Sequence, residues 1–298
     1  MFSCRRWRKS PGIFPQVMPG KVKITINSVG VHICVPSQKE NPMTRNVLIT
    51  LCYDGSGYHG WQVQQNAVSV QQVFQEALYK ILSERPSLKG CSRTDTGVHA
   101  RQFCISMQLE SAIPCQRLQG ALNHFLPPDM AVLDCREVPM EFHARYSCKG
   151  KEYMYSIWNH PVRSPFLRDR ALHYWYSLDV DKLNQAASYF LGSHDFTSFC
   201  TIDSRERGDM TRTITKSEWK REGSLVTYRV AADGFLYNMV RILVGTMLRV
   251  AQGKFQPEDM PKILAAMDRN KAGPTAPACG LCLDKVFYDE RDLSLESS

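Results

Sequence analysis

Long apolar runs are missing from this sequence. No run approaches the ~18 consecutive residues that a membrane-spanning helix requires, so we expect no membrane crossing. The apolar fraction of 43% and the charged fraction of 22% are those of a globular protein. A chain of 298 residues allows one large domain or two domains of ordinary size.

A disulfide framework is also missing. The eleven cysteines are odd in number and lack dense, regular spacing, which favours a reducing compartment. Cys279 and Cys282 form the single C-x-x-C pair, and no second pair completes the ligand set of a structural zinc site. We therefore expect no metal, and we place these two cysteines in or beside a strand.

Acidic residues are absent from residues 1–39, which contain seven Lys or Arg. Subtracting these from the 37 basic and 29 acidic residues of the whole chain leaves 30 and 29. The body is nearly neutral, so nucleic-acid binding needs a local basic face. Scattered surface charge is the alternative reading of the candidate residues, which are Arg93, Arg101, Arg145, Lys149, Lys151, Arg163, Arg168 and Arg170.

The first 42 residues have no apolar stretch of the secretory kind. Their basic, acid-free composition fits a transit peptide, but no amphipathic period accompanies it. The alternatives are a disordered tail, or a non-native extension with Met43 as the true start. We favour these alternatives because a convincing strand follows Met43. Residues 1–42 are thus interpreted as a tail, and the protein is expected in the cytoplasm.

The first half of the body alternates strands and helices. Residues 69–84 have apolar side chains at helical spacing, and Ser69 with Gln72 predicts a capping box. Residues 114–126 predict a second helix, opened by Pro114. The predicted strands are residues 46–55, a short segment between 86 and 91, residues 101–110 and residues 130–139.

The second half has a similar order of elements without any repeat in sequence. Residues 235–253 are apolar on nearly every side and predict a deeply buried helix that Gly253 ends. The other predicted elements are a strand at 151–159, a helix at 179–192, paired strands at 211–223 and 224–234, a short helix at 257–268 and a strand at 281–289.

These patterns predict an α+β fold. We expect two related ferredoxin-like halves whose antiparallel sheets join, with helices covering one face and an active-site cleft between the halves. The predicted boundaries are 46–148 for the N-terminal half, which carries the catalytic loop, and 149–290 for the C-terminal half, which carries an arginine-bearing helix.

The segment "CSRTDTGVHA" (91–100) is too polar and too interrupted for a core. Thr94 and Thr96 flank Asp95 and offer hydrogen bonds, and Gly97 allows a sharp turn or the close approach of a ligand. The segment also lies between two elements, where sites are commonly displayed. A surface ion pair is the ordinary alternative, so these features make Asp95 a candidate only.

Six blocks of the sequence resemble the TruA family of tRNA pseudouridine synthases, in the family's order. They are "YDGSGYHGWQ", "SRTDTGVHA", "FHARYSCKGKEYMY", "GSHDFTSF", "DGFLYNMVRILVG" and "AGPTAPACGLCL", and together they span about residues 46 to 290. The resemblance implies an isomerase that converts uridine to pseudouridine in the anticodon arm of tRNA, at positions 38, 39 and 40. It also implies no cofactor, and a homodimer across which one tRNA lies.

The resemblance assigns roles to three residues at the reaction centre. Asp95 matches the catalytic aspartate, and it is left open whether this carboxylate attacks the sugar or removes a sugar proton. Arg241 matches the arginine that pairs with it and keeps it ionised; we place Arg241 one turn into the long helix. Tyr153 matches the tyrosine that stacks on the target base.

Other substrate contacts are implied more weakly. Leu281 matches an apolar residue of the same pocket, and four residues match RNA contacts: Arg93, Phe142, His143 and Arg145. Arg145 and Lys149 are expected to lie on the link between the halves, in a basic cleft. His99 and His194 are interpreted as structural hydrogen-bonding residues.

Two rival functions remain open. One is a binding module that holds RNA without catalysis, which the joint presence of Asp95, Tyr153 and Arg241 disfavours. The other is a related synthase that acts on mitochondrial tRNA or on mRNA, which the acid-free tail suggests.

Overall fold

The computed structural model describes residues 25–27, 30–32, 44–201 and 208–295. The chain divides into two compact units, residues 1–42 and residues 43–298. In the first unit, β1 (Thr25–Asn27) pairs antiparallel with β2 (Gly30–His32). The prediction of a disordered or non-native tail falls on residues that lie mostly outside the described part of the chain.

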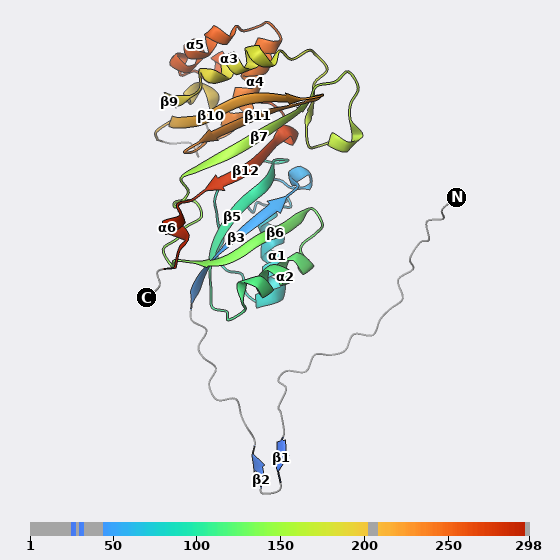
Figure 1. Ribbon diagram of the computed structural model, residues 1–298, viewed down its shortest axis with the longest axis vertical. Helices are drawn as coiled ribbons and strands as arrows, with labels where there is room; N and C mark the ends of the chain where they lie inside the picture. Colours follow the sequence, from blue (N-terminus) through green and yellow to red (C-terminus); the bar gives the residue numbers. More distant parts are fainter. Residues whose placement is uncertain (1–24, 28–29, 33–43, 202–207, 296–298) are drawn as a thin grey trace, which may run out of the picture. The chain divides into compact units, whose positions relative to one another are not determined.

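The second unit is built on one 10-stranded sheet, in the order β6-β3-β5-β12-β7-β11-β10-β9, with β4 beside β5 and β8 beside β7 (Figure 1). Two pairs, β12 with β5 and β7 with β8, are parallel, and the other pairs are antiparallel. The expected α+β class with a mainly antiparallel sheet is therefore confirmed. The strands are β3 (Arg45–Tyr53), β4 (Lys89–Gly90), β5 (His99–Leu109), β6 (Met130–Val138), β7 (Gly150–Trp158), β8 (Leu172–His173), β9 (Gly192–Asp195), β10 (Thr211–Glu222), β11 (Leu225–Ala232) and β12 (Leu281–Phe287).

Apart from α6, the helices gather toward the two ends of this sheet. Figure 1 shows α1 and α2 beside β3, β5 and β6, and α3, α4 and α5 beside β9, β10 and β11. In the described part of the chain, no helix has both the length and the apolar character of a membrane span. The helices are α1 (Val70–Leu82), α2 (Cys115–Phe125), α3 (Val180–Ser188), α4 (Met239–Ala251), α5 (Met260–Ala266) and α6 (Glu290–Leu293), with 3-10 turns η1 (Gly55–Gly57), η2 (Pro165–Leu167), η3 (Thr197–Phe199), η4 (Pro257–Asp259), η5 (Arg269–Lys271) and η6 (Ala278–Gly280).

The last strand, β12, lies in the middle of the sheet. It runs parallel to β5 and antiparallel to β7, so it connects strands that precede residue 148 with strands that follow it. This placement brings the C-terminal segment against the loop that precedes β5. The division into two ferredoxin-like halves at 148 and 149 stays a prediction.

One predicted capping interaction and one predicted helix start are wrong in detail. The Ser69 hydroxyl accepts a hydrogen bond from the Gln72 backbone N–H, but the Gln72 side chain bonds Glu76, so the reciprocal half of the capping box is missing. The long helix α4 begins at Met239 and not at residue 235, because Asn238 adopts a left-handed conformation with φ 62°. The predicted burial of α4 is confirmed, since ten of its thirteen residues are buried.

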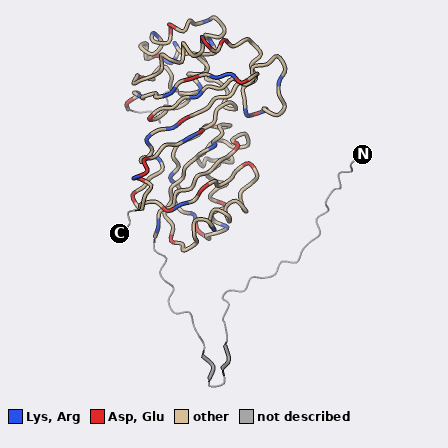
Figure 2. The backbone as a smooth tube through the Cα atoms, in the orientation of Figure 1, with Lys and Arg blue, Asp and Glu red and all other residues tan. Residues whose placement is uncertain are grey.

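A row of ion pairs crosses the centre of the sheet. The Arg229 Nη1 atom lies 2.7 Å from Glu152 Oε1 and 2.5 Å from Asp284 Oδ2. Arg101 contacts Asp284 at 3.1 Å, and Lys216 contacts Glu152 at 3.5 Å. The five residues come from five strands, so their charges tie β5, β12, β7, β11 and β10 together. Figure 2 shows basic and acidic positions interleaved along these strands.

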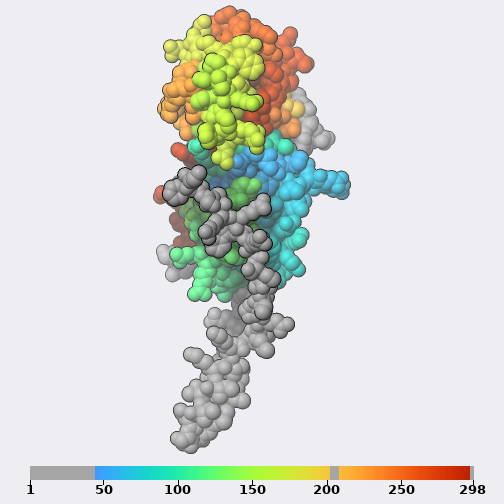
Figure 3. Space-filling view, turned by 90° about the vertical axis from the view of Figure 1, so that its right-hand side faces the viewer, coloured from blue at the N-terminus to red at the C-terminus, as the bar shows by residue number. Residues whose placement is uncertain are grey.

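An ion pair fastens the segment between β7 and α3 to the turn after β3. The Arg170 Nη2 atom lies 2.8 Å from Asp54 Oδ2. Burial raises the pKa of Asp54, but hydrogen bonds from Ser56 and Arg170 outweigh burial and hold this pKa at about 2. In Figure 3 the yellow-green surface of this segment meets the blue surface of the region after β3.

Candidate active site

The loop that carries Asp95 is held by its backbone between β4 and β5. The Gly97 N–H donates to the Tyr58 carbonyl at 3.2 Å, and the Val98 N–H donates to the Asp95 carbonyl at 3.1 Å. Gly97 has φ 78°, a conformation that a residue with a side chain rarely adopts. The loop thus turns sharply just after Asp95, as the sequence suggested.

Neither threonine beside Asp95 donates a side-chain hydrogen bond to it, contrary to the expectation. The Thr94 hydroxyl hydrogen-bonds the Tyr53 hydroxyl at 2.9 Å and so anchors the loop to β3. The Thr96 side chain makes no hydrogen bond with another described residue. His99, which we expected to be structural, accepts the Gly55 N–H at Nδ1 over 3.0 Å and lies 3.2 Å from the Cys279 carbonyl at Nε2.

Asp95 and Arg241 form an ion pair. The Arg241 Nη1 atom donates to Asp95 Oδ2 at 3.1 Å, and the side chains are 18% exposed for the arginine and 28% for the aspartate. Arg241 Nε donates to the Ala276 carbonyl at 2.7 Å, and Nη1 also donates to Asn238 Oδ1 at 2.9 Å. Because three acceptors hold one planar group, the guanidinium has a fixed orientation. Asp95 Oδ1 accepts no hydrogen bond from a described residue.

The start of α4 explains how Arg241 reaches Asp95. The sequence predicted Arg241 one turn inside the helix, whereas it is the third helical residue. Asn238 sits just before the helix, and its Nδ2 atom donates to Thr201 Oγ1 at 3.1 Å. Asn238 therefore links the guanidinium to a second segment. Our sequence reasoning missed Asn238, and the available signal was an amide residue at the point where the apolar helix begins.

Tyr153 lies beside the same loop. Its hydroxyl is 3.3 Å from the Ser92 hydroxyl, and its ring is nearly perpendicular to that of Phe235 with centroids 5.0 Å apart. Burial raises the pKa of Tyr153, so its phenol stays protonated at neutral pH. Tyr155, the next residue on that strand face, is fully buried and donates to the Pro277 carbonyl at 2.7 Å, as a core residue does.

These residues line a cleft of about 740 Å³, a volume typical of small-molecule sites. Tyr153 from β7 and Leu281 from β12 belong to its wall. Its charge is uneven, because Asp95 is the one acidic side chain among its described lining residues. Five lining residues are basic: Arg93, Arg145, Lys151, Arg212 and Arg241.

Two of the four residues predicted to contact RNA line the cleft, and two do not. Arg93 is exposed at the cleft without an ion-pair partner among the described residues, and Arg145 also lines the cleft. Phe142 is buried with its ring 5.1 Å from Tyr288, and His143 Nδ1 accepts the Arg145 N–H at 3.1 Å. Neither Phe142 nor His143 lines the cleft, and their RNA contacts stay predictions.

Lys149 does not join the basic cleft as expected. Its Nζ atom lies 3.3 Å from Asp289 and 3.5 Å from Asp292, and the hydrogen bond to Asp289 raises the pKa of Lys149. The alternating side-chain directions of a strand explain why Lys151 points into the cleft with Tyr153. Lys151 and Arg212 are the basic residues that take the place we expected for Lys149.

No group of three or more His, Cys, Asp or Glu side chains is arranged for metal binding in residues 44–201 and 208–295. Cys282 lies in β12 and Cys279 in the preceding turn, as expected for residues in or beside a strand. Both are free thiols.

Comparison with known proteins identifies the family of this chain. The family model described as tRNA pseudouridine synthase matches residues 50–147 and 186–289. These ranges contain Asp95 and Arg241 and cover more than half of the chain. The chain therefore belongs to the tRNA pseudouridine synthase family.

Curated relatives narrow the class further. A protein named tRNA pseudouridine synthase A from Acetivibrio thermocellus is 45% identical over 244 residues, which are 82% of this chain and 100% of the relative. A protein of the same name from Ruminiclostridium cellulolyticum is 43% identical over 244 residues, again 82% of this chain and 100% of the relative. Among solved structures, a Cbf5–Nop10–Gar1 complex is 12% identical with a TM-score of 0.34 over 79% of this chain and 57% of that chain, a likeness that carries no argument here.

Proposed function

We propose that this protein converts uridine to pseudouridine at positions 38, 39 and 40 in the anticodon arm of tRNA, through Asp95 and without a cofactor. The observation that carries the proposal is the 3.1 Å contact of Asp95 with Arg241 in a cleft whose other charged lining residues, among those described, are basic. Membership of the family supplies the reaction class. The basic lining suits a polyanionic substrate.

The chemistry needs one carboxylate. Breaking the bond between N1 of uracil and C1′ of ribose builds positive charge at the sugar, which the Asp95 carboxylate stabilises. In sugar hydrolysis a second carboxyl group protonates the leaving oxygen. Uracil leaves as a delocalised anion and needs less help, which fits a cleft with Asp95 as its one acidic residue among those described. The base then turns, C5 bonds C1′, and the proton lost from C5 is balanced by the proton gained at N1.

Arg241 acts by holding the Asp95 carboxylate in position. Its guanidinium is tied to the Ala276 carbonyl and to Asn238, so the free Oδ1 atom of Asp95 faces a substrate without losing its orientation. The target base must leave the RNA stack, and an aromatic face offsets part of that unstacking energy. Tyr153 supplies the aromatic face, and Leu281 supports it from the neighbouring strand.

The RNA backbone is held by the basic residues of the cleft. Arg93 and Arg145 bind phosphate or base edges, and Lys151 and Arg212 extend the basic lining. His143 supports Arg145 by accepting its backbone N–H, and Phe142 packs the same turn. Phosphate contacts set position more than sequence, so tRNA shape dominates substrate choice.

The proposal includes a cytoplasmic homodimer with one tRNA spanning both subunits, and two ferredoxin-like halves at 46–148 and 149–290. Light scattering with and without tRNA measures the subunit count, and a monomeric complex would contradict the dimer. Deleting residues 1–42 should leave folding and activity intact. Cell fractionation and the sequence of the mature amino terminus separate this location from a mitochondrial one.

Tritium release tests the activity directly. Ring rejoining at C5 expels the hydrogen there, so tRNA made with uridine tritiated at C5 should release about one tritium for each pseudouridine formed. A variant tRNA with cytidine at positions 38 to 40 is the matched control and should release none. Tight binding of the uridine-containing tRNA with no release supports the rival function of a binding module.

A further inference from the structure

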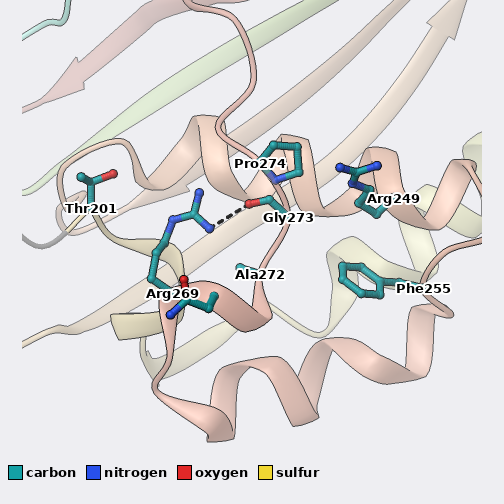
Figure 4. Close-up of a pocket in the computed structure, with 8 residues that line it drawn as sticks. Thr201, Arg249, Phe255, Arg269, Ala272, Gly273 and Pro274 are labelled. Carbon is teal, nitrogen blue, oxygen red and sulfur yellow. Dashed lines mark hydrogen bonds between the residues drawn. The ribbon is translucent and has the colours of Figure 1, made fainter.

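A second hollow of about 790 Å³ lies beside the C-terminal half of α4. Its described lining residues are Thr201, Arg249, Phe255, Arg269, Asn270, Ala272, Gly273 and Pro274. Figure 4 shows Arg269 and Thr201 on one side of the Ala272–Pro274 segment, and Arg249 and Phe255 on the other side. None of the lining residues belongs to the catalytic cleft.

The wall of this hollow is firmly packed against α4. The Gly273 N–H donates to the Thr246 hydroxyl at 2.9 Å. A Cβ atom on Gly245 would lie 1.7 Å from the Pro274 carbonyl oxygen, so the two backbones are in direct contact there. The wall of the hollow is therefore held in place by its packing against α4.

The charge of the hollow is positive. Neither Arg249 nor Arg269 has a carboxylate within 4.0 Å among the described residues, and no described lining residue is acidic. Arg269 donates to the Gly273 carbonyl at 2.9 Å and to the Thr275 hydroxyl at 3.3 Å. Burial lowers the pKa of Arg269, which is the cost of its uncompensated charge. The neighbouring Asp268 carboxylate forms no ion pair with Arg269 within 4.0 Å; it accepts hydrogen bonds from Asn270.

Both arginines keep donors for a ligand. A guanidinium has five N–H groups, and the hydrogen bonds of Arg269 to Gly273 and Thr275 use two of them. Arg249 donates one hydrogen bond, to Gln252 Oε1 at 3.0 Å. A phosphate group accepts several charge-assisted hydrogen bonds and matches the guanidinium fork, so an anion of this class completes the site.

The hollow continues the basic lining of the catalytic cleft. Thr201 lines the hollow, and its hydroxyl accepts a hydrogen bond from Asn238, which lines the cleft. One side-chain contact thus connects the rims of the two sites. An RNA strand that leaves the cleft over this contact meets Arg249 and Arg269 next.

From these contacts we infer that the hollow binds phosphodiester groups of the same tRNA, away from the target uridine. This inference rests on the proposed function for the identity of the RNA. The site positions the substrate and adds affinity, because phosphate contacts carry no base information. It takes no part in the chemical step.

The salt dependence of tRNA binding tests this inference. Arg249→Gln in the full chain should weaken tRNA binding several-fold at low salt and reduce the slope of log K against log salt by roughly 0.7 to 0.9, the value for one lost phosphate contact. The single-turnover rate at saturating tRNA should stay unchanged. Arg269→Lys keeps the charge but loses the fork, so it should weaken binding less.

Arg117→Gln is the matched control, since Arg117 is exposed on α2 and lines neither site. It should leave the slope unchanged. An Arg249→Gln slope equal to that of the wild type, or a loss no larger than that of Arg117→Gln, overturns the inference. If inorganic phosphate raises the melting temperature through Arg249 while the tRNA slope does not change, the hollow is a free-anion site and the inference also fails.

The binding assay separates this inference from the proposed function. If tritium release fails while the Arg249→Gln slope falls as expected, the phosphate site stands and the proposed isomerase activity fails. If tritium release succeeds and the slope does not change, the activity stands and the phosphate site fails.

Discussion

The two faces of the central strand β7 carry arginine–carboxylate contacts of different kinds. On one face, Arg229 lies between Glu152 and Asp284, and both carboxylates are only 6% exposed. On the other face, in the cleft, Arg241 holds Asp95, which is 28% exposed and keeps one oxygen without a partner among the described residues. The enclosed contact can only stabilise the sheet, whereas the open contact can also meet a substrate.

Asp95→Asn breaks the open contact and should have the largest effect. We expect kcat to fall by roughly 10³-fold or more, the scale of losing a catalytic nucleophile, while tRNA affinity stays within a few fold. Mass spectrometry of the nucleosides formed measures this. Turnover close to that of the wild type would remove Asp95 from the reaction.

Arg229→Met breaks the enclosed contact and should act on stability. It removes the shared partner of two buried carboxylates and leaves Asp284 with the exposed Arg101 at 3.1 Å and Glu152 with Lys216 at 3.5 Å. The loss should therefore cost up to about 3–5 kcal/mol of unfolding free energy. Chemical denaturation measures the loss, and kcat per folded molecule should stay within about twofold, as expected for a change outside the cleft.

Arg101→Met is the control for that change, because this arginine also contacts Asp284 but is 61% exposed. It should cost at most about 1 kcal/mol, the usual value of an exposed ion pair. Equal losses for Arg229→Met and Arg101→Met would contradict the difference between enclosed and exposed contacts.

Asn238→Gly weakens the open contact without breaking it, so it should reduce kcat less than Asp95→Asn does. Glycine accepts the left-handed φ of 62°, so the melting temperature should change little. The loss of one hydrogen bond to a charged group, about 1.5 kcal/mol, should reduce kcat by roughly tenfold. A fall in affinity at constant kcat would show that Asn238 binds RNA and does not position Arg241.

The pH dependence of stability should show the smallest effect. The pKa of Asp54 is lowered from its ordinary value of 3.8 to about 2, so the folded state favours the carboxylate. Its contribution to stability is complete above about pH 4 and is lost as pH falls toward 2. Melting temperatures at pH 5 and pH 2.5 should differ less in Asp54→Asn than in the wild type, and an identical difference would contradict this.

The sequence predicted the order of the main elements because their periodicity is strong. It also indicated Asp95, since Gly97 and the polar surroundings mark a sharp turn outside the core. The capping box failed because Gln72 found Glu76 as a local partner. The start of α4 was misplaced because an asparagine in the left-handed region gives no signal in apolar periodicity.

The partners of charged residues were hardest to predict. Lys149 and Lys151 have the same side-chain type and lie two residues apart, but Lys149 contacts Asp289 and Asp292 whereas Lys151 lines the cleft. The partners of Lys149 lie 140 or more residues away in the sequence. The hollow lined by Arg249 and Arg269 was also not predictable from sequence, because segments 249–255 and 269–274 meet only through tertiary packing.

A double-mutant cycle on Asp95 and Arg241 tests most directly whether the two side chains act as one unit. Single-turnover rates of pseudouridine formation are measured for the wild type, Asp95→Asn, Arg241→Gln and the double variant, with thermal melts to correct for unfolded protein. If Arg241 works through Asp95, the double variant is no slower than Asp95→Asn alone. Losses that simply multiply would show two independent roles and contradict the central claim.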